Sequence, residues 1–281
     1  MGGASRLLLS LLGAYLALCL LALLFQRKLM YLPLRAPELR PRDWGLSAAE
    51  EVRFGDGIHG WWLRAPAERR RELAVVFCNG NAAHMGYRVP KARELLGLGL
   101  DVLLFDYPGY GSSAGSPSKK ALVAAASAAY AEVGRRGSRV GLYGESIGAA
   151  VAVEVASQQA LSGRPVAFLI LEGAFSSAAE LGAHHYWFLP VRWFLIDRFE
   201  PAAQIDRVGC PLLMLHAEND EVVPLALAQR LYQRAGEPKR LVILPRAGHN
   251  DLPFAAELEY RRAIADFLAA LAPAPNRNPD A

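Results

Sequence analysis

The stretch Gly144-Glu145-Ser146-Ile147-Gly148 is the starting point for interpreting the sequence. It fits the pattern G-x-S-x-G, in which a serine sits on a sharp turn between a strand and a helix. A β-prone segment, residues 139–143, precedes it, and an Ala-rich helical pattern, residues 149–156, follows it. The glycines on either side of Ser146 remove bulk that would clash in such a turn. A chance match has a probability of about one in ten in such a chain, so the interpretation depends on the partners that the sequence supplies.

Short apolar segments typical of strands alternate with helical patterns along most of the chain. The predicted strands are residues 51–54, 59–63, 73–78, 101–105, 139–143, 167–171, 212–215 and 241–244. The predicted helices are residues 87–96, 118–133, 149–156, 225–234 and 257–271. Asp56-Gly57 separates the first two strands and is a strong hairpin signal. The alternation predicts an α/β fold with a mostly parallel eight-stranded sheet and helices on both faces.

Residues 7–25 form an uncharged apolar run of nineteen residues. A helix of about this length crosses the apolar core of a bilayer, so we predict one transmembrane anchor within residues 1–28. A cleaved signal peptide is the alternative, but the end of the run offers no small-residue cleavage site. Basic residues are more frequent after the run than before it. This bias slightly favours a cytoplasmic location for the rest of the chain.

Composition divides the remainder of the chain. Residues 29–48 contain three prolines and no helical or strand period, which indicates a juxtamembrane linker. Residues 49–272 are the predicted α/β domain, and residues 273–281 form a polar tail. Within the domain, residues 176–205 are longer than an ordinary connection and rich in aromatic side chains. They predict either a small apolar cap or a peripheral packed helix.

The overall composition excludes several classes of protein. Of the 281 residues, 53% are apolar and 21% charged, so a large core can form and disorder is not expected. The formal net charge is +4, but no basic stripe alternates with aromatic residues, so nucleic-acid binding is not expected. Cys19, Cys78 and Cys210 have no metal-site spacing and are expected to be buried thiols. We predict neither a cofactor nor a metal, and nothing in the sequence indicates an oligomeric state.

Chemically capable side chains follow four of the predicted strands, at the end of a parallel sheet where ligands bind. They are Asn79-Gly80-Asn81, Ser146, Asp220 and His249. A serine hydroxyl needs an imidazole to accept its proton and a carboxylate to hold that imidazole in the right tautomer. We therefore expect Ser146 to be a nucleophile, His249 its base and Asp220 the acid. Glu218 and Glu221 are alternative acids because sequence alone does not orient neighbouring side chains.

Backbone N–H groups near the serine are the expected stabilisers of an oxyanion. We expect one from Ile147, the residue after the serine, and one from Asn81 in the loop after the third strand. A plain tight turn is the alternative interpretation of Asn79-Gly80-Asn81. Asp106 and Glu172 also end strands, and we expect them to hold loops by hydrogen bonds to backbone N–H groups.

Five motifs together resemble a known superfamily. They are Phe77-Cys78-Asn79-Gly80-Asn81-Ala82, Phe105-Asp106-Tyr107-Pro108-Gly109-Tyr110-Gly111-Ser112-Ser113, Gly144-Glu145-Ser146-Ile147-Gly148, Asn219-Asp220-Glu221-Val222-Val223-Pro224 and Gly248-His249. With the N-terminal apolar run, they resemble the α/β-hydrolase superfamily, and within it the membrane-anchored alpha/beta hydrolase domain-containing proteins related to serine aminopeptidases and prolyl oligopeptidases. The resemblance implies an α/β-hydrolase fold with Ser146, Asp220 and His249 as the catalytic triad. Two positions depart from the family's pattern: Asn79 replaces a usual histidine, and Ala217 replaces a frequent glycine.

These observations predict a serine hydrolase that cleaves carboxylic esters or thioesters, including lipidic ones, through an acyl-enzyme. The expected partners are a small-molecule or lipid ester and, through the N-terminal helix, a membrane. A serine peptidase of the prolyl oligopeptidase type is the alternative enzyme. A non-catalytic binding protein with the same fold is the alternative from another class.

Overall fold

The computed structural model describes residues 2–271, so the predicted polar tail lies outside the described residues. Eight strands form one sheet in the order β10-β9-β8-β7-β4-β6-β3-β2. They are β2 (Glu50–Phe54), β3 (Ile58–Leu63), β4 (Leu73–Cys78), β6 (Asp101–Phe105), β7 (Arg139–Glu145), β8 (Leu169–Glu172), β9 (Leu212–Ala217) and β10 (Lys239–Leu244). Strand β3 pairs antiparallel with β2 and β6, and the other neighbours are parallel. The predicted mostly parallel eight-stranded sheet is therefore confirmed.

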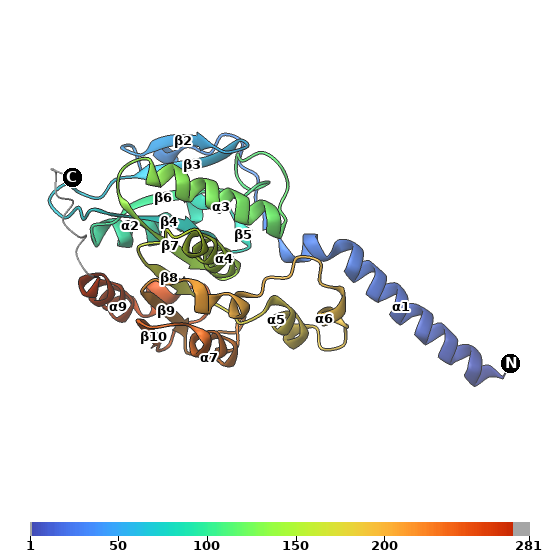
Figure 1. Cartoon of the computed structure of the whole chain (residues 1–281). Coiled ribbons are helices and arrows are strands. Elements are labelled where there is room, and N and C mark those ends of the chain that lie inside the picture. Colours follow the sequence, from blue (N-terminus) through green and yellow to red (C-terminus); the bar gives the residue numbers. More distant parts are fainter. Residues whose placement is uncertain (1, 272–281) are drawn as a thin grey trace.

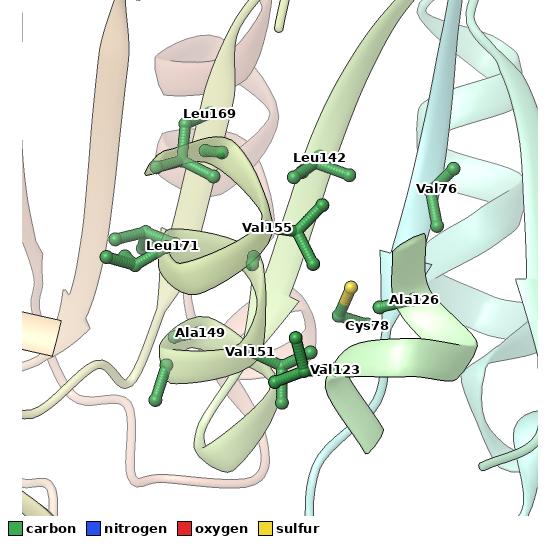
Figure 2. Packing of buried hydrophobic residues seen from close by; sticks show 14 of the residues in the cluster. Val76, Cys78, Val123, Ala126, Leu142, Ala149, Val151, Val155, Leu169 and Leu171 are labelled. Atoms are coloured by element: carbon green, nitrogen blue, oxygen red, sulfur yellow. The ribbon is translucent and has the colours of Figure 1, made fainter. Parts of the chain in front are cut away.

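Helices cover both faces of the sheet (Figure 1). Outside residues 176–205, the α-helices of the domain are α2 (Val89–Gly97), α3 (Lys119–Gly134), α4 (Ile147–Leu161), α7 (Leu225–Arg234), α8 (Leu252–Ala255) and α9 (Glu257–Ala270). On one face, Val76 of β4 and Leu142 of β7 pack with Val123 of α3 and Val151 of α4 (Figure 2). On the other face, Val75 of β4 packs in the core that α2 and α9 cover. Side chains thus alternate between the two cores along β4, as in any strand buried on both faces.

Within the predicted linker 29–48, the first two residues belong to the N-terminal helix, and the rest connect it to the sheet and pack against the domain at a few positions. The side chains of Tyr31 and Leu39 are buried. The strand β1 (Leu32–Pro33) pairs with β5 (Ala82–Ala83), which follows the loop after β4. We expected neither a helix nor a strand in this stretch, and the pairing forms because that loop offers its backbone to Leu32. The 3₁₀ helices are η1 (Pro41–Trp44), η2 (Met85–Arg88), η3 (Pro201–Ala203) and η4 (Ile205–Arg207).

The N-terminal helix α1 (Gly3–Met30) projects from the domain on the side where α5 and α6 lie (Figure 1). Among residues 2–271 it is the one helix long and apolar enough to cross a membrane, so it fits a membrane anchor. Helices α5 (Ala178–His185) and α6 (Val191–Phe194) belong to residues 176–205, which we call the insertion. The insertion follows β8 and leads back to β9.

Candidate active site

Ser146 occupies a sharp turn between β7 and α4. Its backbone has φ 55° and ψ −117°, a positive φ that non-glycine residues rarely adopt. A Cβ atom at Gly144 would lie 2.5 Å from Ala149 Cα, and one at Gly148 would lie 2.1 Å from the Cys78 carbonyl oxygen. Only glycine fits at either position, so these two residues let the turn pack against β4 and α4. The strand, turn and helix expected around Ser146 are present.

Asp220 and His249 are joined by a hydrogen bond between largely buried side chains. His249 Nδ1 lies 2.8 Å from Asp220 Oδ2. Asp220 Oδ1 accepts hydrogen bonds from the backbone N–H groups of Val222 at 2.9 Å and Val223 at 2.6 Å. The carboxylate is thereby fixed, and a proton on Nδ1 leaves Nε2 of the ring free to accept another.

The two alternative acids contact backbone groups instead of the imidazole ring. Glu221 Oε2 accepts a hydrogen bond from the backbone N–H of His249 at 3.2 Å. Glu218 Oε2 accepts one from the backbone N–H of Arg246 at 3.3 Å. Of the three acids considered from the sequence, Asp220 is therefore the one placed to orient the ring.

The pKa of Asp220 lies below its ordinary value. Burial acts to raise this pKa, but the hydrogen bond to His249, the charge of His249 and the Val223 N–H outweigh that effect. His216 Nε2 lies 3.7 Å from Asp220 Oδ2 and 3.0 Å from the Val223 carbonyl oxygen. Burial lowers the pKa of His216, which favours its neutral form. Asp220 is thus held ionised beside the imidazole of His249.

Ser146 and His249 line the same cavity, but no hydrogen bond joins their side chains. The His249 ring packs over Gly173, which directly follows β8 and has φ 56°. A Cβ atom at Gly173 would lie 2.8 Å from His249 Cε1, so the absence of a side chain makes room for the ring. Contacts between a nucleophile and its base are often long in a free enzyme and shorten when substrate binds.

The expected oxyanion donors lie at the same cavity. Ile147 is the first residue of α4, so its N–H has no acceptor within the helix. In the part of the chain that the structure describes, the Asn81 N–H donates no hydrogen bond. The rest of Asn81 is held: its carbonyl accepts from Tyr110 Oη at 2.7 Å, and its Nδ2 donates to the Met30 carbonyl at 3.0 Å. The last of these contacts ties the loop after β4 to the end of α1.

A buried network of charges, not anticipated from the sequence, lies beneath the turn. Lys91 Nζ lies 2.7 Å from Glu145 Oε2 and 2.5 Å from Glu172 Oε1. Arg88 also pairs with Glu145 at 2.9 Å. Burial would raise the pKa of Glu145, but the charges of Lys91 and Arg88 hold it at about 2. A Cβ atom at Gly80 would lie 3.0 Å from Glu145 Oε1, so the network supports the loop that carries Asn81.

The two other strand-end acids behave differently from each other. Asp106 Oδ1 accepts a hydrogen bond from the Met85 backbone N–H at 2.6 Å, as expected for a residue that holds a loop. Glu172 was expected to do the same, and that expectation was wrong. Its carboxylate binds Lys91 and the Tyr143 hydroxyl, because the packing of α2 places a buried lysine beside it.

A cavity of about 510 Å³ opens beside Ser146. Its walls come from the turn, the loop after β4, α1 and the insertion. The lining includes Cys19, Ala22, Gln26, Leu29, Met30, Asn81, Ser146, Ile147, Phe175, Leu181, Tyr186, Leu189, Phe194, Leu195 and His249. The lining also includes the charged side chains of Arg88 and Glu145. Because most of the lining side chains are apolar, the cavity suits a ligand with an apolar portion.

No set of side chains resembling a metal site occurs among the residues that the structure describes. Within residues 2–271 no group of three or more His, Cys, Asp or Glu side chains could hold a metal ion. His185, one of two adjacent histidines in α5, instead has Nε2 2.7 Å from the Val222 carbonyl oxygen.

Comparisons with known proteins agree with this fold. The family described as serine aminopeptidase, S33, matches residues 69–201, a range that includes Ser146 but ends before Asp220 and His249. An uncharacterized protein of Mycobacterium tuberculosis is 40% identical over 235 residues, 80% of this chain and 81% of that protein. The lysophosphatidylserine lipase ABHD12 of Danio rerio is 32% identical over 303 residues, 91% of this chain and 78% of that protein.

Two solved structures are similar in fold. An esterase of Pyrococcus furiosus has a TM-score of 0.68 at 19% identity and covers 85% of this chain and 98% of its own. A monoacylglycerol lipase of Paleococcus ferrophilus has a TM-score of 0.57 at 18% identity and covers 76% of this chain and 99% of its own. The chain belongs to the α/β-hydrolase superfamily and is a hydrolase.

Proposed function

We propose that the protein is a serine hydrolase that cleaves carboxylic esters through an acyl-enzyme on Ser146. The observation that carries this proposal is the hydrogen-bonded pair of Asp220 and His249 at the cavity that Ser146 also lines. A relative named as a lipase and a structural neighbour named as an esterase support ester chemistry. Thioesters share the acyl group and remain within the proposal.

In the proposed reaction, Ser146 Oγ attacks the ester carbonyl while His249 Nε2 accepts the hydroxyl proton. Asp220 holds the ring and stabilises the imidazolium that forms. The tetrahedral intermediate collapses, and His249 returns the proton to the departing alkoxide. Water then attacks the acyl group on Ser146, again with His249 as base. The carboxylic acid leaves as His249 returns the proton to Ser146 Oγ.

The backbone N–H groups of Ile147 and Asn81 are the proposed oxyanion donors. Both belong to residues that line the cavity, and within the described residues neither N–H group donates a hydrogen bond. Donors of this kind act because they are already oriented toward the place where negative charge develops. Since they are backbone groups, the replacement of a usual histidine by Asn79 leaves them in place.

A peptidase is the second candidate, and the description of the matching family favours it. We rank it lower because the cavity that Ser146 lines is bounded largely by apolar residues of α1 and the insertion. A non-catalytic binding protein is the third candidate. It is ranked last because the Asp220 carboxylate is already fixed against His249, an arrangement that mere binding would not need.

We also propose that α1 is retained as a membrane anchor and that the domain lies on the cytoplasmic side. The apolar composition of α1 supports the anchor. The excess of basic residues just after the apolar run supports the sidedness.

The test is turnover of p-nitrophenyl esters of graded chain length, with acyl-CoA and aminoacyl substrates measured in parallel. Ester turnover should fall by more than about 10⁴-fold in Ser146→Ala, because the nucleophile is lost. Ser162→Ala, which removes an exposed hydroxyl beyond α4, is the matched control and should be unaffected. Release of amino acids from peptides without ester turnover would favour the peptidase.

A further inference from the structure

One wall of the cavity beside Ser146 is built from α1. Cys19, Ala22, Gln26 and Met30 all line it. Their spacing of three or four positions places them on one face of the helix. Most other residues of the apolar run are exposed. One face of the helix therefore lines the cavity, and the rest of its surface is exposed.

Another wall is the insertion, which is hydrogen-bonded to α1 at several positions along the helix. Tyr15 Oη donates a hydrogen bond to the Phe188 carbonyl at 2.9 Å. Gln26 Oε1 accepts one from the Ile196 N–H at 2.7 Å. Near the end of the helix, Arg27 pairs with Asp197. These contacts make α1 and the insertion a single unit around the cavity.

These contacts extend far along α1. Tyr15 and Arg27 are separated by about 18 Å along the axis, at about 1.5 Å per residue. The hydrocarbon core of a bilayer is about 30 Å thick, so one leaflet accounts for about 15 Å. Where α1 crosses a bilayer, the insertion lies beside it at the depth of one leaflet.

The outer surface of the insertion suits that location. Trp187 and Trp193 are each 81% exposed. Ile196 and Phe194 of the same segment are also exposed apolar side chains. Large apolar groups gathered on one surface mark an interaction site, and tryptophan is enriched where lipid meets water.

We propose that the space between α1 and the insertion binds the acyl chain of a substrate lipid, which enters it directly from the leaflet that surrounds Trp187 and Trp193. This inference rests on the proposed function, because it places the ester carbonyl at Ser146. The substrate class is a bilayer-resident ester with a long acyl chain. The anchor is then part of the substrate site as well as a tether.

The test uses the full chain reconstituted in phosphatidylcholine vesicles and two ester probes. One probe is 1-oleoylglycerol carried in the vesicle bilayer, and the other is water-soluble p-nitrophenyl acetate. In Ala22→Phe, the larger side chain occupies the part of the cavity beside α1. It should lower oleoylglycerol turnover by about tenfold or more, because several methylenes lose their apolar contacts. Acetate turnover should fall by a much smaller factor, because the acetyl group has no chain to reach that wall. Ala17→Phe, on the exposed side of α1, is the matched control and should change neither.

A second variant tests the lipid contact without touching the cavity. Trp187→Ser combined with Trp193→Ser should selectively lower oleoylglycerol turnover, because the insertion loses the apolar side chains that face the leaflet. Both side chains are 81% exposed, so the change lies outside the core of the domain. Leu258→Ser, at a residue of α9 that is 79% exposed, is its control.

The outcomes separate the inference from the proposed function. Three results would overturn the inference. The first is an equal loss of oleoylglycerol and acetate turnover in Ala22→Phe. The second is unchanged oleoylglycerol turnover in both Ala22→Phe and the tryptophan variant, and the third is equal effects of Ala22→Phe and Ala17→Phe. Wild-type turnover of acetate without any turnover of oleoylglycerol would overturn it too, while leaving the serine mechanism intact. If the wild-type protein does not hydrolyse acetate at all, the result counts against the proposed function itself.

Discussion

Asp197 in the insertion accepts hydrogen bonds from Arg27 Nε at 2.8 Å and from the Tyr31 hydroxyl at 3.1 Å. The Asp197 side chain is nearly buried, whereas half of the Arg27 side chain is exposed. This carboxylate therefore joins the end of α1 and the start of the following segment to the insertion. The walls of the cavity depend on that connection.

Asp197→Ala should loosen this connection. The buried Tyr31 hydroxyl loses its partner, which lowers the free energy of unfolding by about 1–3 kcal/mol. Thermal unfolding in detergent micelles measures the change. Asp206→Ala removes an exposed carboxylate of the same region and should cost less than about 0.5 kcal/mol. Equal shifts in the two variants would mean that Asp197 does not hold the insertion.

Gly148→Ala should disrupt the turn that carries Ser146. The new Cβ would lie 2.1 Å from the Cys78 carbonyl oxygen, a backbone atom of a central strand. We expect destabilisation of about 3 kcal/mol or more and loss of esterase activity. Gly134→Ala, at the end of α3, meets no atom within 4 Å and should be neutral or slightly stabilising. Chemical denaturation of both variants gives the comparison, and a stable, active Gly148→Ala protein would contradict the described packing.

Lys91→Met should be strongly destabilising. It leaves the buried carboxylates of Glu145 and Glu172 without their shared cation, at a cost of about 3–5 kcal/mol. Lys119→Met removes a partly exposed pair with Glu154 and should cost less than about 1 kcal/mol. Denaturant unfolding of both proteins measures the difference.

Adding Glu172→Gln to Lys91→Met provides a check on the charge argument. Glu145 keeps its pair with Arg88 in Lys91→Met, whereas Glu172 loses its cation. The second change removes the negative charge of Glu172, so part of the lost stability should return. If the double variant has a lower free energy of unfolding than Lys91→Met, the destabilisation by Lys91→Met arises from packing and not from charge.

Asp106→Asn should change how stability depends on pH. Burial raises the pKa of Asp106 to about 7, above about 3.9 in the unfolded chain. Its stabilising contribution is therefore complete below about pH 4 and is lost as pH rises to about 7, a difference of up to about 4 kcal/mol. Asparagine keeps the oxygen that accepts from Met85 and does not ionise. The variant should exceed the wild type in stability increasingly from pH 4 to pH 8, and parallel curves would contradict this.

Local signals in the sequence predicted the sheet and the approximate positions of the site residues. The pattern around Ser146 is contained in five consecutive residues, and Asp220 and His249 each follow an apolar strand. Such signals depend on neighbouring residues, so they can be recognised without knowing the fold. Their mutual distances follow from the sheet order, because β7, β8, β9 and β10 are successive neighbours.

Contacts between distant segments could not be predicted in the same way. Lys91 lies on a helix where a lysine ordinarily faces water, and only the packing of α2 brings it to Glu145 and Glu172. The contacts between α1 and the insertion join residues more than 160 positions apart. No local pattern records such pairings. The cytoplasmic placement of the domain stays a prediction, because it rests on the distribution of basic residues alone.

The most direct test of the serine mechanism is to label the protein with a fluorophosphonate and locate the adduct by mass spectrometry of the digested chain. We predict one adduct on the peptide that contains Ser146, and none in Ser146→Ala. Circular dichroism of the variant should match the wild type, which shows that the fold is intact. An adduct on another residue, or undiminished labelling of Ser146→Ala, would contradict the assignment of Ser146 as the nucleophile.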